Sequence, residues 1–138
     1  MKQCVSSLAA AALVALCGAT LAAHHSAVQF DFAKSVSIKG VVQKFRAINP
    51  HMQLVLRVTD DKGARDIEFE GHSTNNMYRS GYRDNMIKVG DTITVFVAPL
   101  TSGAEGGYVT AAITASGTRF GQRSRAELAL EREKAEGR

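Results

Sequence analysis

The chain has 138 residues, a formal net charge of +4 and two cysteines. Its length fits a single domain with one hydrophobic core. Both cysteines, Cys4 and Cys17, lie close to the N-terminus, which excludes a disulfide framework, a thiolate metal site and a cysteine nucleophile in the rest of the chain.

The N-terminus has the pattern of a Sec-type signal peptide. Lys2 is the only charged residue before Asp31, and residues 4–21 are apolar or small. Small residues then surround a cleavage site after Ala22 or Ala23. We therefore expect residues 1–22 to be removed and the mature protein to be periplasmic or secreted, with no stable membrane span. Loss of Lys2 lowers the net charge from +4 to +3, and an exported protein does not normally meet nucleic acid, so we expect no nucleic-acid partner.

The first half of the mature chain predicts three strands. Residues 36–45 are rich in β-branched side chains, and Gly40 among them indicates a bulge or a sharp bend. Residues 52–59 alternate apolar and polar side chains, and residues 64–70 form a second such run. Because Asp60-Asp61-Lys62-Gly63 between them is a strong turn signal, the two strands are expected to form a hairpin.

The second half predicts a short helix and two further strands. The helix lies within residues 73–82, with Ser73 or Thr74 as its cap and Gly81 as its stop. Strands are predicted at residues 92–100 and 108–115, with a glycine-rich loop between them. Strands with short turns and one small helix predict a mainly β fold, a five-to-six-stranded OB-like or partly open β-barrel over residues 23–121.

Residues 122–138 form a tail of different composition. Arginine, lysine and glutamate dominate it, with a few alanines and leucines between them. This mixture favours a helix with ion pairs one turn apart, although its apolar stripe is narrow. We expect a charged tail that is helical or disordered.

The histidines are the strongest candidates for chemistry, and all four follow the predicted cleavage sites. His24 and His25 are adjacent at the mature N-terminus, His51 follows Asn49-Pro50, and His72 follows a predicted strand. Imidazole is a favoured ligand for copper, nickel and zinc, and it needs no help from a thiolate.

The cleavage site decides how the terminus could bind a metal. After cleavage behind Ala22, His25 is the third residue, and its imidazole, the terminal amine and two backbone amide nitrogens can hold Cu(II) or Ni(II) in a square plane. After cleavage behind Ala23, His24 comes first, and its amine and imidazole can bind copper together with His51 or His72. Both routes favour copper, and the predicted metal ligands are His24, His25 and His51.

Each histidine also has a purely structural interpretation. The terminal pair is also typical of a polar linker. His51 would then be a loop residue ordered by Pro50, with Asn49 capping the turn, and His72 a surface residue at the strand-to-helix junction.

The sequence contains no recognisable catalytic motif, and we predict that the protein is not an enzyme. Glu68 and Glu70 are two residues apart on a predicted strand and so share one face. They could act as an acid–base pair or form the solvent-facing side of a half-buried strand. Tyr78, Tyr82 and Tyr108 either line a ligand groove or pack in the interior.

Several short motifs follow one another along the chain: His24-His25-Ser26, Phe30-Asp31, Gly40-Val41-Val42, Asn49-Pro50-His51, Glu70-Gly71, Arg79-Ser80-Gly81-Tyr82 and Lys88-Val89-Gly90-Asp91. In this order they resemble a family of small exported bacterial proteins known only as a domain of unknown function. The resemblance extends to about Gly121, and Phe69 and Tyr82 stand near positions that often carry tryptophan in that family. It implies an exported β-rich domain without an assigned activity, and it singles out residues 24–26 and 49–51 as recurring polar pieces.

Two functions remain open from the sequence. The first is a periplasmic metal-binding protein, with copper as the expected ion. The second is a non-catalytic β-barrel module that binds an envelope protein or a saccharide through a barrel face and residues 73–82.

Overall fold

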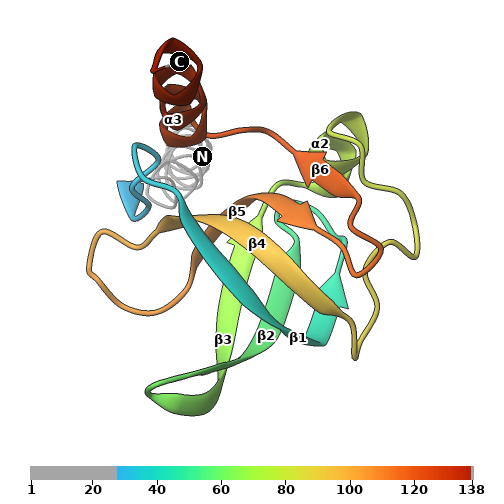
Figure 1. Ribbon diagram of the computed structural model, residues 1–138. Helices are drawn as coiled ribbons and strands as arrows, with labels where there is room; N and C mark the ends of the chain where they lie inside the picture. The colour runs from blue at the N-terminus through green and yellow to red at the C-terminus, as the bar shows by residue number, and fades with distance from the viewer. Residues whose placement is uncertain (1–27, 138) are drawn as a thin grey trace, which may run out of the picture.

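The computed structural model describes residues 28–137 (Figure 1). In chain order its elements are β1 (Val36–Arg46), β2 (Gln53–Asp60), β3 (Gly63–Gly71), α2 (Thr74–Arg79), β4 (Thr92–Pro99), β5 (Gly107–Ile113), β6 (Arg119–Gly121) and α3 (Arg125–Glu136). The predicted strands and the predicted helix are all present, with small differences at their ends.

Five of the strands close into a barrel. β1 pairs antiparallel with both β2 and β4, while β2 pairs with β3 and β4 pairs with β5. A parallel pairing between β3 and β5 closes the ring, and the short β6 extends β5 outside it. With α2 between β3 and β4, this arrangement confirms the predicted OB-like barrel. β6 has too few residues to show an alternation pattern, so the sequence does not predict it.

The hairpin of β2 and β3 has the register that the turn signal implies. Asp60 pairs with Gly63 across the turn, and the ladder continues without a shift to Gln53 and Glu70. Gly63 has a φ of 91°, a left-handed conformation that glycine adopts without strain. The turn therefore fixes which side chains face one another along the whole hairpin.

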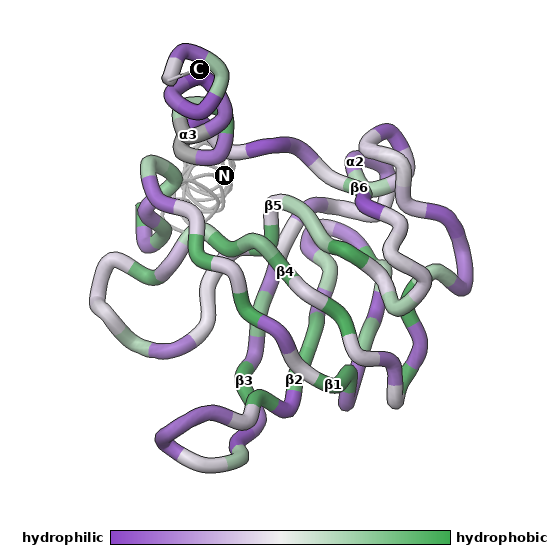
Figure 2. Tube along the Cα trace, viewed as in Figure 1, coloured by the Kyte–Doolittle hydropathy of each residue, from purple (hydrophilic) through white to green (hydrophobic). Residues whose placement is uncertain are grey.

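The interior of the barrel is filled by the apolar side chains that alternate along the strands. Figure 2 shows the hydrophobic stretches following the strands while the connecting loops are mostly hydrophilic. The largest fully buried side chains are Leu54, Leu56, Ile93, Val42, Val95 and Val97. Phe69 and Tyr82 are each 4% exposed and belong to the same core.

β1 pairs with β4 along its first half and with β2 along its second half, and Gly40 lies next to the change of partner. A Cβ atom at Gly40 would lie 2.9 Å from the backbone oxygen of Arg57, so only glycine allows β1 and β2 to approach so closely there. The irregularity in the β1–β2 register lies between Val42 and Lys44 and not at Gly40. Gly40 thus marks a close backbone approach, and the bulge follows it.

Both helices have well-formed N-terminal caps. Ser73 caps α2, because its Oγ accepts a hydrogen bond from the Asn76 N–H at 3.4 Å. α3 starts with a capping box between Ser124 and Glu127, and Arg119 of β6 donates a 2.8 Å hydrogen bond to the same Glu127. The charged tail is therefore helical from its first turn and tied to the barrel. Neither helix in the described part of the chain has the length and apolar character needed to cross a membrane.

Candidate functional site

The outer face of the β2–β3 hairpin brings two histidines together at the end remote from its turn. Gln53 of β2 pairs with Glu70 of β3, and both side chains point away from the barrel interior. The regular ladder ends at this pair, and beyond it the Met52 N–H donates to the His72 backbone oxygen at 3.1 Å. His51 and His72 both lie against the ring of Tyr108.

His51 is held by the backbone of the neighbouring strand. Its Nδ1 lies 3.1 Å from the carbonyl oxygen of Gly71. A carbonyl oxygen can only accept, so Nδ1 is the donor of this hydrogen bond, and in the tautomer that carries its proton there Nε2 has a lone pair for a metal. Metal-binding histidines are commonly fixed in this way, by a backbone carbonyl on the other ring nitrogen.

His72 is half-buried, and its surroundings favour the neutral form of its ring. Burial lowers its pKa below 6.5, and the proximity of His51 lowers it further. Its Nδ1 lies 3.1 Å from the hydroxyl oxygen of Tyr108. When this nitrogen donates to the phenol, the Nε2 of His72 is free to bind a metal as well.

Tyr108 of β5 forms the centre of an aromatic cluster with these histidines. Its ring centroid lies 6.1 Å from that of His51 and 5.2 Å from that of His72. Phe30 and Phe32 pack on it from the other side, at 5.5 Å and 5.4 Å. Burial, and next the charge of Glu70, raise the pKa of Tyr108, so that its hydroxyl stays protonated at neutral pH.

The start of the described chain is anchored at this cluster. The Asp31 N–H donates to the Pro99 oxygen at 2.8 Å, and the Thr101 N–H donates to the Gln29 oxygen at 2.8 Å. Phe30 forms a β-bridge with Leu100 between them. The first residues of the described chain therefore lie next to Tyr108.

The loop between β1 and β2 is fixed to α2 and carries His51. The Thr74 N–H at the start of α2 donates to the Asn49 side-chain oxygen at 3.1 Å. Asn49 thus bridges to the helix and does not cap its own turn. This contact holds the Asn49-Pro50-His51 segment close to the strand end that carries His72.

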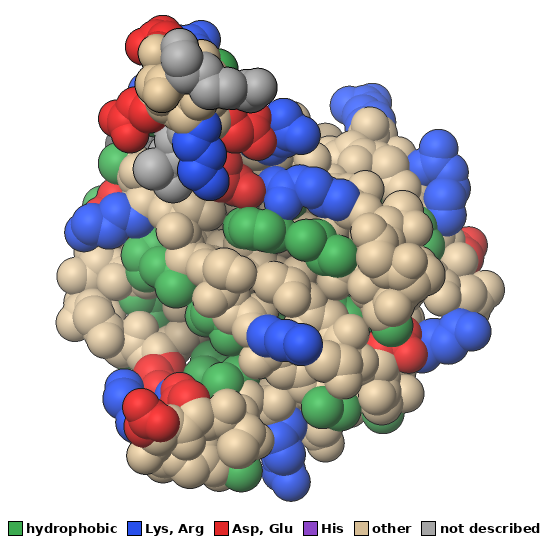
Figure 3. All heavy atoms as spheres, viewed as in Figure 1, with side chains coloured by type: hydrophobic (Ala, Val, Ile, Leu, Met, Phe, Trp, Pro, Cys, Tyr) green, Lys and Arg blue, Asp and Glu red, His purple; other side chains and the backbone are tan. Residues whose placement is uncertain are grey.

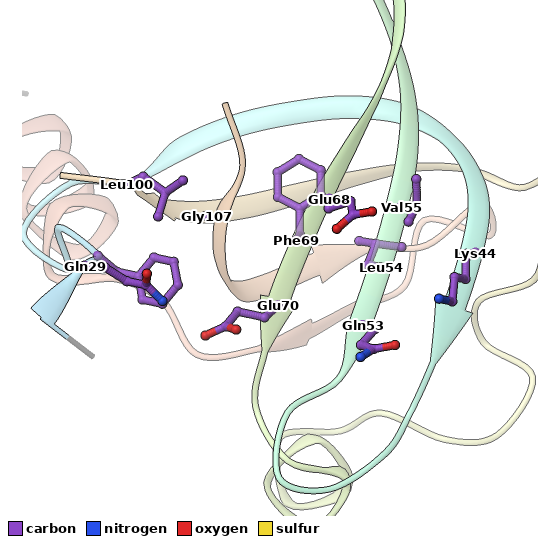
Figure 4. Close-up of a pocket in the computed structure, with 11 residues that line it drawn as sticks. Gln29, Lys44, Gln53, Leu54, Val55, Glu68, Phe69, Glu70, Leu100 and Gly107 are labelled. Atoms are coloured by element: carbon purple, nitrogen blue, oxygen red, sulfur yellow. The ribbon is translucent and has the colours of Figure 1, made fainter. Parts of the chain in front are cut away.

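A hollow continues the same face from Glu70 toward β1 (Figure 4). Its volume is about 360 Å³, and we call it the Glu70 hollow; its polar and apolar lining includes Gln29, Lys44, Gln53, Glu68, Glu70 and Leu100. Glu68 is exposed, as expected for the solvent-facing side of β3, whereas Glu70 is partly buried. The two carboxylates thus differ in their surroundings.

The predicted metal ligands stand as follows. His24 and His25 lie outside the described residues, and His51 lies beside His72 and Tyr108. Within residues 28–137, no group of three or more His, Cys, Asp or Glu side chains is arranged to hold a metal ion.

The sequence reasoning missed the role of Tyr108 and the proximity of His51 to His72. The sequence does contain a signal that the two histidines lie close together. His51 is nine residues before Asp60, and His72 is nine residues after Gly63, on the other side of the turn. The turn therefore brings them to the same end of the hairpin, just beyond the last regular pair of Gln53 and Glu70. No comparable signal exists for Tyr108, because it depends on the parallel pairing of β3 with β5.

The chain was also compared with known proteins. No curated protein matches it significantly. The model of one family, described as a family of unknown function (DUF6152), matches residues 11–110, a range that includes the described histidines, Tyr108 and Glu70. Since this match covers more than half of the sequence, the chain belongs to that family of unknown function, DUF6152.

Proposed function

We propose that the mature protein is a periplasmic metal-binding protein, with copper as its first candidate ion. His24, His25 and His51 are the proposed ligands, and His72 is a further imidazole at the same place. The observation that carries the proposal is the position of His51, which lies beside His72 and against the aromatic cluster that anchors residues 30–32. Two imidazoles and the first residues of the described chain thus meet in one region.

The length of the connecting chain supports a shared site. His25 precedes Val28 by three positions, and Val28 is two positions from Phe30, which packs on Tyr108. Three residues span at most about 11 Å. We therefore propose that the terminal histidines reach His51 and His72.

The chemistry of these groups favours copper. Neutral imidazoles and a terminal amine supply nitrogen ligands, and nitrogen ligands in a tetragonal arrangement suit Cu(II). If cleavage follows Ala23, the amine and imidazole of His24 combine with His51 and His72 into a set of four nitrogens. If cleavage follows Ala22, the terminal tripeptide fills the square plane by itself, and His51 adds at most a weaker ligand. The two routes therefore differ in how strongly binding depends on the barrel.

The test is a Cu(II) titration of mature protein purified from the periplasm, so that the natural terminus is intact. Mass spectrometry of the same sample fixes the first residue, and electron paramagnetic resonance reports the nitrogen ligands. We expect a Kd below about 1 µM, equivalent to about −8 kcal/mol. His24→Ala or His25→Ala should weaken binding at least tenfold, whereas Asn75→Ala, at an exposed position on α2, should not. Weaker binding than micromolar, or binding that ignores the histidines, would refute the proposal.

The second function, a non-catalytic module for an envelope protein or a saccharide, stays a prediction. The Glu70 hollow favours it, because OB-type barrels use their β2–β3 face for oligosaccharides. This is an argument from fold alone. In this case His24→Ala combined with His25→Ala should leave partner binding intact, and a large loss would count against the module.

A further inference from the structure

The Glu70 hollow holds two carboxylates that take part in no ion pair of residues 28–137. Several acidic side chains elsewhere in this range do lie within 4.0 Å of lysine or arginine: Asp31, Asp60, Asp66, Glu105, Glu127 and Glu131. Others, such as Asp61, do not, but Asp61 is exposed in a turn. Among the ion pairs of this described range, Glu68 and Glu70 do not occur. The lining of the hollow is therefore locally acidic in a chain with a positive net charge.

Glu70 has a stronger requirement for a partner than Glu68. Its Oε1 is buried, and no hydrogen-bond donor of the described chain reaches it. Figure 4 shows its side chain pointing toward the segment that carries Gln29, with Lys44 on the opposite side of the hollow beyond Gln53. Buried carboxylate oxygens in proteins are nearly always satisfied by a donor, so this one is available to accept a hydrogen bond from a ligand.

The size and charge of the hollow narrow the class of ligand. A water molecule takes about 30 Å³ of liquid, so 360 Å³ holds an organic molecule and greatly exceeds the space that a single metal ion needs. An anion would face both Glu68 and Glu70. A protonated amine, in contrast, offers Glu70 three donors and an opposite charge.

Lys44 lies at the other end of the hollow, where it can contact the far end of a ligand. It lies on β1 and is in register with Glu68 through Val55 of β2, so it stands two strands across and two residues along from Glu70. This separation amounts to about 12 Å. An extended chain of three residues covers about the same distance, and it carries an amine at one end and a carboxylate at the other.

We propose that the Glu70 hollow binds a short peptide, with the terminal ammonium of the peptide held by Glu70 and its carboxylate facing Lys44. Phe30 and Leu100 form an apolar wall beside this path, against which small side chains can pack. This site is separate from the proposed metal ligands.

The test is a titration followed by ¹⁵N–¹H NMR, with trialanine as the probe and a chelator present so that no metal contributes. Two further probes isolate the ends of the ligand: N-acetyl-trialanine lacks the amine, and trialanine amide lacks the carboxylate. We expect trialanine to shift the resonances of residues 53–55 and 68–70 with a Kd below about 1 mM. Acetylation should weaken binding at least about tenfold, and amidation should weaken it less.

Two variants of the protein test the same contact by changing the carboxylate and not the peptide. Glu70→Gln should weaken trialanine binding at least about tenfold, whereas Asp61→Asn, which removes the same charge at an exposed turn position, should leave it unchanged. Equal binding of the free and acetylated peptides would overturn the proposal, as would binding that ignores Glu70→Gln or the absence of shifts around the hollow. The acetylated probe keeps the test decisive even if Glu70→Gln does not fold.

Discussion

The two ends of the β2–β3 hairpin present the same ladder of cross-strand pairs with opposite chemistry. At the turn end, Arg57 donates to both carboxylate oxygens of Asp66 at 2.8 Å and 3.1 Å, and Arg65 binds Asp60 and Glu105 together. Figure 3 shows charges of both signs gathered over this turn. At the other end lie the rings of His51, His72 and Tyr108 and a buried carboxylate oxygen of Glu70 without a hydrogen-bond partner in the described chain.

The difference shows where the molecule has unused binding capacity. Hydrogen bonds from Arg65 and next from the Lys62 backbone lower the pKa of Asp60 to about 2, so the turn end is saturated by its own residues. At the open end, by contrast, the Nε2 of His51 and the Oε1 of Glu70 have no partner in the described chain. Charges satisfied within the fold serve stability, whereas polar atoms left open are available to a ligand.

Removing the centre of the open end should have the largest effect. Tyr108→Ala should lower the free energy of unfolding by about 2 kcal/mol, below the 3–5 kcal/mol typical of fully buried aromatic rings, because Tyr108 is half-buried. It should also weaken Cu(II) binding at least tenfold, because both histidines and Phe30 pack on this ring. Urea unfolding and a copper titration measure the two effects.

Tyr108→Phe is the matched control, since it keeps the ring and removes only the hydroxyl. Its stability should stay within about 1 kcal/mol of the native protein. If Tyr108→Ala changed neither stability nor copper binding, the aromatic cluster would not be the organising element of this end.

His72→Ala should affect copper binding more than stability. We expect Cu(II) affinity to fall about tenfold, which corresponds to about 1.4 kcal/mol, because a half-buried nitrogen ligand is lost. Arg57→Ala at the turn end is the matched comparison and should leave the copper affinity unchanged. Equal losses from both substitutions would mean that the two ends do not differ in function.

The pH dependence of unfolding should separate the two ends. The folded-state pKa of His72 lies below 6.5, so its contribution to stability is complete above 6.5 and is lost as the pH falls through the folded-state value. Asp60 behaves in the same sense in a lower window, with its contribution present above 3.8 and lost toward about 2. Chemical unfolding at stepped pH should show that His72→Gln removes only the upper loss. A variant with an unchanged profile near pH 6 would contradict this assignment.

The smallest effect is expected at the turn end itself. Arg65→Ala should lower stability slightly, and the loss should shrink at high salt, because exposed ion pairs contribute little and are screened. Thermal unfolding at low and high ionic strength measures it. A large loss that ignores salt would show that Arg65 acts by packing, since its side chain is 24% exposed.

Local signals predict most of the fold, and long-range pairing accounts for what they miss. The alternation of residues 52–59 and the turn at Gly63 predict the hairpin, because both signals lie within a few residues. β6 is too short to carry a pattern, and the contact of Glu70 with β5 depends on strands far apart in the sequence. The same limit applies to the site: His51 could be singled out from its motif, whereas Tyr108 and the Glu70 hollow arise only when the barrel closes.

The central claim is that the terminus and the barrel hold one metal ion together, and a double-mutant cycle tests it most directly. Cu(II) affinity would be measured for the mature protein with its natural terminus, for His24→Ala, for His51→Ala and for the double variant. If the terminus and the barrel share one ion, the losses of Cu(II) binding free energy in the two single variants should be strongly non-additive, with a coupling free energy above about 1 kcal/mol. Additive losses, or no loss from His51→Ala, would show that the barrel takes no part in binding the metal.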